Sequence, residues 1–218
     1  WLVASCGGGA SAPEPVAPVA TETINGKVID GYVERALVCV DLNLNGRCDE
    51  AEPHAMSDAA GAYALTVPVT ADPGAPLVAE VSAGQSRDSD SPGAVDVSYR
   101  MASPSRSYST AITPFTTLVR LSGQANYPLA EDLARSVLGL PPKFDVHLDT
   151  APPAGSTAQG AAKGVVSALK ALGPQLDLSP AESVVARLNL QATGVGVGPN
   201  PPFHSVRRTA YLPVVRND

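Results

Sequence analysis

Short runs of β-branched and other apolar residues, separated by turns of Gly, Pro and Asp, dominate the first hundred positions of the chain. Runs of this kind are typical of β-strands that bury one face. They predict strands at residues 24–30, 36–41, 62–67, 77–82 and 95–101, the first two joined by a turn at Gly31. Short strands at this regular spacing favour an antiparallel β-sandwich.

After residue 101 the apolar residues recur at helical spacing instead. Thr113 followed by Pro114 is a typical helix start, with Thr113 as the capping residue. Apolar residues three or four positions apart predict helices at 128–138 and 158–172, and a capping box at Ser179 predicts a last helix at 180–191. The predicted fold class is therefore mainly β and then α, an antiparallel β-sandwich followed by a small helical region.

This change of pattern divides the chain of 218 residues into four parts. We expect a flexible tether at 1–22, a sandwich at 23–107, a helical region at 108–193 and a Gly/Pro-rich tail at 194–218. Hydrophobic residues make up 44% of the chain but aromatic residues only 5%, so the core must consist of Val, Leu and Ala. The net charge of -6 argues against a nucleic-acid partner, because phosphate binding needs clustered Lys and Arg.

Residues 41–52 have the spacing of a calcium-binding loop. Oxygen-bearing side chains occupy loop positions 1, 3, 5, 9 and 12, and glycine occupies position 6. Calcium takes six to eight oxygen ligands, and a short loop supplies them when alternate side chains converge around a sharp turn. The predicted ligands are Asp41, Asn43, Asn45, the backbone carbonyl of Arg47, Asp49 and Glu52. Because only three of them are carboxylates, we expect weak affinity and a structural role.

The same segment has a simpler interpretation. Asn45-Gly46 is a common sequence for a two-residue turn between two strands, and the acidic residues beside it would then be solvated and bind nothing.

Two of the three cysteines flank this loop. A Cys39–Cys48 disulfide would close a small ring across the turn. The alternatives are a buried, reduced pair, or two strands in a different register that does not pair these cysteines. The sequence contains no Cys-x-x-Cys motif, which gives little support to a zinc site or to thioredoxin-type redox chemistry.

The third cysteine belongs to Val3-Ala4-Ser5-Cys6, which resembles the lipobox of bacterial lipoproteins. This resemblance implies that Cys6 is acylated, that residues before it are the end of a signal peptide, and that Gly7 after it favours the outer membrane. Because the sequence contains no uninterrupted apolar run of about 20 residues, we expect attachment to a membrane through this lipid anchor. The alternative is a secreted protein or a fragment in which Cys6 is incidental.

Residues 23–101 resemble the transthyretin-like (prealbumin-like), carboxypeptidase-regulatory-like β-sandwich, and they are similar to the calcium-binding B repeats of adhesins. The resemblance rests on the segment at 26–31, the acidic loop and the motif Asp58-x-x-Gly61-x-Tyr63-x-Leu65. It implies a hairpin whose Tyr63 and Leu65 point inward, and a structural or binding module without catalysis. The segment at 109–119 also resembles one that follows such modules in bacterial lipoproteins.

Candidate catalytic chemistry is sparse. Asp145, His147 and Asp149 alternate on an extended segment, as either a metal or base arrangement or a solvated loop, and the sequence contains no Gly-x-Ser-x-Gly or His-Glu-x-x-His motif. We therefore expect a non-catalytic, calcium-binding cell-surface lipoprotein whose further partner is an envelope protein or a glycan. The alternative is an accessory module of an extracellular hydrolase with catalysis elsewhere.

Overall fold

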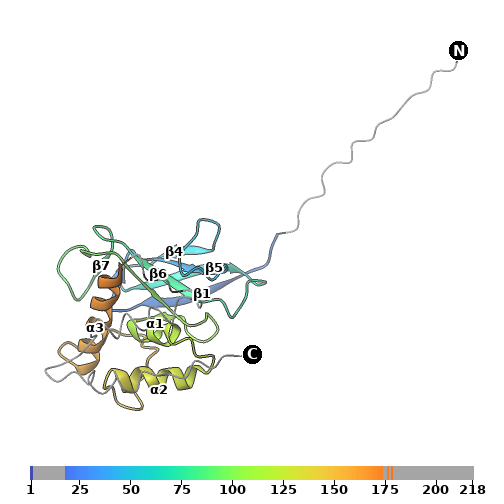
Figure 1. The fold of residues 1–218 in the computed structure, drawn as a ribbon. Helices are drawn as coiled ribbons and strands as arrows, with labels where there is room; N and C mark the ends of the chain where they lie inside the picture. Colours follow the sequence, from blue (N-terminus) through green and yellow to red (C-terminus); the bar gives the residue numbers. More distant parts are fainter. Residues whose placement is uncertain (2–17, 174–175, 177, 179–218) are drawn as a thin grey trace.

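The computed structural model describes residue 1, residues 18–173, and residues 176 and 178. This part of the chain is mainly β with some α (Figure 1). The strands are β1 (Thr21–Val28), β2 (Val33–Glu34), β3 (Leu37–Val40), β4 (His54–Met56), β5 (Ala62–Pro68), β6 (Leu77–Val81), β7 (Arg87–Asp88), β8 (Tyr99–Ala102) and β9 (Ala111–Ile112). The helices are α1 (Pro114–Leu121), α2 (Tyr127–Val137) and α3 (Thr157–Leu172).

The strands form three sheets. One has the order β5-β1-β9, the second has the order β4-β3-β6-β8, and β2 pairs with β7 in a third. All pairs are antiparallel except β1 with β9, which run parallel at Lys27 and Val28. The parallel pair departs from the purely antiparallel arrangement that the local pattern predicts.

The two larger sheets share one core. Along β5, Tyr63, Leu65 and Val67 are buried while the residues between them are more exposed, which is the alternation of a strand with one inward face. These side chains belong to the same buried cluster as Val38 of β3 and Val78 of β6. The predicted inward orientation of Tyr63 and Leu65 is therefore confirmed.

Five predicted strands correspond to β1, β3, β5, β6 and β8, with shifts at the ends. The strand predicted at 95–101 begins only at Tyr99, because residues 96–98 are exposed and lie outside the ladder. The turn at Gly31 does not join two strands of one sheet, since β1 and β3 lie in different sheets. The first strand begins at Thr21, two residues before the predicted start of the sandwich at residue 23.

The helices lie together at one side of the strands (Figure 1). The predicted start of α1 is confirmed, because the Thr113 hydroxyl accepts hydrogen bonds from the backbone N–H groups of Phe115 and Thr116. Helices α2 and α3 begin one residue before their predicted starts. The helix predicted at 180–191 and the tail at 194–218 lie outside the described residues. Among the helices that the structure describes, none is long and apolar enough to cross a lipid bilayer.

The predicted boundary at residue 107 does not separate two cores. Strand β9 follows that boundary and pairs with β1, and α1 and α3 contact β8. The buried cluster includes Ile24 near the start of β1 as well as Leu178 beyond α3. The two larger sheets, α1 and α3 therefore share one hydrophobic core, whereas Ala130 and Ala134 of α2 pack with Val119 of α1 in a second, smaller cluster.

Candidate metal centre

The predicted calcium loop connects β3 to β4. Their register pairs Leu37 with Met56 and Cys39 with His54, so the connection spans residues 41–53. A two-residue hairpin at Asn45-Gly46 would instead pair the residues on either side of those two. The simpler interpretation of Asn45-Gly46 as a hairpin turn is thus wrong, and the loop is long enough to fold around its own interior.

Asp41 and Glu52 are the buried ends of this loop, with exposed fractions of 0% and 6%. The Asp41 carboxylate accepts hydrogen bonds from the backbone N–H groups of Asn45 and Gly46, both at 2.9 Å. The Glu52 carboxylate accepts from the N–H of Leu42 at 2.7 Å and, through its other oxygen, from that of Asp49 at 3.1 Å. Each carboxylate therefore reaches across the loop and fixes its backbone.

Asp49 joins the two asparagines. Its Oδ2 accepts from Asn43 Nδ2 at 2.6 Å and from Asn45 Nδ2 at 2.7 Å. The amide oxygens of Asn43 and Asn45 accept from the backbone N–H groups of Asn45 and Arg47, and each retains a second lone pair. All five predicted side-chain ligands are thus brought into one hydrogen-bonded loop.

Two residues of the loop have a left-handed backbone. Gly46 has φ +72°, as the glycine at position 6 of the predicted loop requires. Leu44 has φ +61°, which is strained for a residue with a β-carbon, and its side chain is exposed. No packing of the Leu44 side chain accounts for this conformation, whereas the hydrogen bonds of its neighbour Asn45 with Asp41 and Asn43 hold the backbone there.

The electrostatics of the loop favour a cation. Burial raises the pKa of Asp41, and the nearby Glu52 carboxylate raises it further, while hydrogen bonds from Gly46 and Asn45 and the charge of Arg120 lower it. Two buried carboxylates close to one another repel, and a divalent cation between them would remove this repulsion.

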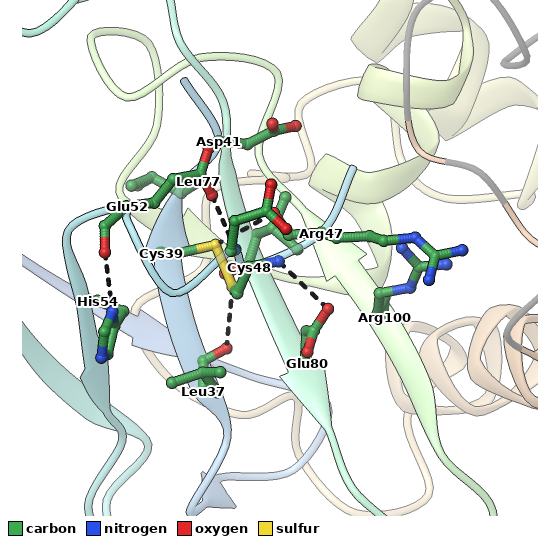
Figure 2. The surroundings of a disulfide bond; sticks show 12 residues. Leu37, Cys39, Asp41, Arg47, Cys48, Glu52, His54, Leu77, Glu80 and Arg100 are labelled. Carbon is green, nitrogen blue, oxygen red and sulfur yellow. Dashed lines mark hydrogen bonds between the residues drawn. A yellow bond between two sulfur atoms is a disulfide. The ribbon is translucent and has the colours of Figure 1, made fainter. Parts of the chain in front are cut away.

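A disulfide between Cys39 and Cys48 attaches the loop to β3, as the sequence predicts, with the two Cα atoms 5.5 Å apart (Figure 2). The Arg47 carbonyl oxygen lies 3.6 Å from Cys39 Sγ, on the disulfide side of the loop. The Cys48 N–H donates to Glu80 of the neighbouring strand β6 at 3.2 Å. The second half of the loop is therefore tied to the sheet by a covalent bond and a hydrogen bond.

The donor set fits calcium better than a transition metal. Oxygen atoms of carboxylates, amides and a carbonyl are the ligands of hard cations. The described residues contain no group of three or more His, Cys, Asp or Glu side chains that could hold a metal ion. The carboxylates of the loop at 41–52 therefore do not form such a group by themselves, and the predicted ligand set also includes the amide oxygens of Asn43 and Asn45.

A second polar cluster surrounds Glu131 of α2, a residue that no sequence motif singles out. Glu131 accepts from the Tyr108 hydroxyl, lies 2.8 Å from His147 Nε2, and forms an ion pair with Arg135. His147 therefore has a buried partner, whereas Asp145 caps its own segment by accepting from the His147 N–H. Because Glu131 and His147 are brought together only by the packing of α2, no local motif could have revealed the pair.

Cys6, the predicted lipidation site, lies outside the described residues. Comparison with models of known protein families, with curated proteins and with solved structures finds no match.

Proposed function

We propose that this chain is a non-catalytic module of the bacterial cell envelope, a prealbumin-like β-sandwich stabilised by calcium in the loop at 41–52. The observation that carries the proposal is the hydrogen-bonded loop at 41–52, in which Asp41 and Glu52 are buried and Asp49 accepts from the side-chain amides of two asparagines. Such a loop is built from the oxygen ligands that calcium prefers.

Calcium in this loop would act on the stability of the sheet. Asp41 directly follows β3, and a single residue, Pro53, separates Glu52 from the start of β4. A cation bound to both carboxylates would join the ends of two paired strands, where the Cys39–Cys48 disulfide already makes one covalent link. The rigid loop and sheet would then present a surface to a partner, an envelope protein or a glycan.

The disulfide supports a location outside the cytoplasm, since disulfides persist in oxidising compartments. Extracellular calcium is abundant enough to fill a weak site, so three carboxylates suffice there. The proposed attachment to the outer membrane is through a lipid on Cys6, and it rests on the lipobox-like sequence around that residue.

The experiment compares Glu52→Gln with a matched control, Asp58→Asn. Gln keeps the shape of Glu52 and one oxygen for the Leu42 N–H but removes the charge. Asp58 likewise accepts two backbone N–H groups, from Ala60 and Ala62, in a turn without other converging ligands. We expect calcium to raise the melting temperature of the natural chain and of Asp58→Asn. The rise in melting temperature should be at least tenfold smaller for Glu52→Gln.

Both variants should lose some stability in chelator, because each carboxylate also holds backbone N–H groups. The difference between the melting temperatures in calcium and in chelator is therefore the quantity that tests the proposal. An equal response to calcium in Glu52→Gln and in the natural chain would show that Glu52 stabilises the turn without a metal.

A further inference from the structure

The calcium loop contacts a segment that is distant in the sequence. A Cβ built on Gly46 would lie 2.8 Å from the backbone nitrogen of Leu178 and 3.0 Å from its Cα. Only a residue without a side chain allows the two backbones to approach this closely. Leu178 and Leu176, which follow α3 in the sequence, are buried, with exposed fractions of 1% and 5%.

Arg100 of β8 connects the loop to this segment. One guanidinium nitrogen donates to the carbonyl oxygen of Gly46 at 2.6 Å, and another donates to that of Leu176 at 2.7 Å. The planar guanidinium holds both carbonyls at once, a geometry that lysine cannot reproduce. Figure 2 shows the Arg100 side chain extending beside the loop, near Arg47.

Arg120 of α1 makes the second connection. Its Nε donates to the carbonyl oxygen of Leu178 at 3.2 Å, and its charge lowers the pKa of Asp41. Asp41 in turn accepts from the Gly46 N–H at 2.9 Å. The ligand at position 1 of the loop, the glycine at position 6 and Leu178 are therefore linked through consecutive contacts.

Resting on the calcium site proposed above, we propose that the loop at 41–52 is also the dock for Leu176 and Leu178, so that calcium binding and docking stabilise each other. A calcium loop requires the sharp turn at position 6, and in the conformation seen here Gly46 is left-handed and its carbonyl accepts from Arg100. Docking requires the same conformation, because Leu178 rests on Gly46. Coupling between two sites is reciprocal, so each event strengthens the other by the same factor.

The direction in which an Arg100 substitution changes the calcium affinity distinguishes this coupling from a purely electrostatic effect. Arg100 places a positive charge next to the loop, so its removal should strengthen the binding of a cation if charge alone matters. The coupling predicts the opposite, weaker calcium binding, because the substitution removes the hydrogen bonds that join the Gly46 and Leu176 carbonyls through Arg100. A coupling free energy of the usual size corresponds to a change of roughly 5- to 150-fold.

The test uses the full chain, with Arg100→Gln and Arg100→Lys as variants. Arg106→Gln is the matched control, because Arg106 also bridges backbone carbonyls, those of Ala71 and Asp72. Calcium affinity is measured by calorimetry and by the calcium dependence of the melting temperature. Docking is measured by hydrogen exchange of the peptides that contain Leu176 and Leu178, in calcium and in chelator.

We expect calcium to slow exchange at Leu176 and Leu178 in the natural chain and in Arg106→Gln. Both Arg100 variants should need roughly 5- to 150-fold more calcium for the same protection. The coupling is overturned if calcium binds and raises the melting temperature while exchange at Leu176 and Leu178 stays the same. It is also overturned if Arg100→Gln binds calcium as tightly as the natural chain or tighter. A natural chain that binds no calcium overturns the proposed function itself.

Discussion

At the scale of single residues, Asp30 is the carboxylate whose pKa departs most from its ordinary value. It is 4% exposed and its Oδ2 accepts from the Tyr99 hydroxyl at 3.3 Å, while its buried Oδ1 has no hydrogen-bond partner among the residues that the structure describes. Burial raises its pKa from 3.8 to about 7, and the carboxylates of Asp88 and Asp90 add to this, while the Tyr99 hydrogen bond and Lys170 act in the opposite direction. Asp30 therefore stays largely neutral in the folded protein at acidic pH values at which an exposed aspartate is ionised.

This shift predicts how stability depends on pH. Because the folded pKa lies above the unfolded value, the folded state binds more protons between pH 4 and 7, and the free energy of unfolding falls as the pH rises through that range. The full effect is on the order of 4 kcal/mol. Asp30→Asn mimics the neutral acid, so its stability should lack this decrease, and it should exceed that of the natural chain at pH 8.

The measurement is urea unfolding of both proteins in chelator from pH 4 to pH 8. Chelator keeps the loop at 41–52 in one state, and the difference between the two curves removes the contribution of carboxylates that do not interact with Asp30. Asp88 and Asp90 interact with Asp30, so the difference reports this acidic cluster with and without the Asp30 charge. Two parallel curves would contradict the account of Asp30, as would an Asp30→Asn variant that is less stable than the natural chain at pH 8.

At the scale of elements, the disulfide links β3 to the middle of the calcium loop. It closes a short ring, so reduction should lower the free energy of unfolding by roughly 2 to 3 kcal/mol. It should also weaken calcium binding, since Cys48 directly precedes the predicted ligand Asp49. Melting curves with and without a reductant measure both effects in the presence and absence of calcium.

The matched control for reduction is the Cys39→Ala/Cys48→Ala protein, in which the reductant has no bond to break. A reductant that lowers the melting temperature of this variant as much as that of the natural chain would show that the effect comes from elsewhere.

The elements that were predictable from sequence carry strong local signals. Thr113 and Pro114 mark the start of α1, and the Asp58 turn with Tyr63 and Leu65 marks β5. Strands β2, β4, β7 and β9 have only two or three residues, too few to show a period. The parallel pairing of β9 with β1 depends on residues about 84 positions apart, at Lys27 and Ala111, which no local pattern encodes.

For the loop at 41–52, the sequence likewise predicted the local residues but not their neighbours from distant parts of the chain. Its ligands are regularly spaced, so the sequence identified Asp41 to Glu52 as a candidate site. Arg100 and Arg120 come from β8 and α1, and Leu178 comes from beyond α3. Their approach to Gly46 follows from tertiary packing, so only the structure could place them beside the loop.

At the scale of the whole molecule, the sheets and helices stabilise one another. Asp90 and Asp96 contact α3 through Lys163 and Lys170, and the buried cluster runs from β1 to Leu178. The loop at 41–52 approaches Leu178 at Gly46, and Leu176 and Leu178 belong to this buried cluster. A cation in the loop would therefore act on strands and helical region together.

Calorimetric titration of calcium into the oxidised chain, with its melting temperature in 10 mM calcium and in chelator, tests this account most directly. We expect saturable binding to one site with a Kd of roughly 0.1 to 1 mM, the range of extracellular modules. The melting temperature should rise by roughly 3 to 10 °C. Absence of binding heat together with an unchanged melting temperature would contradict the central claim and leave residues 41–52 as an acidic loop held by its own hydrogen bonds.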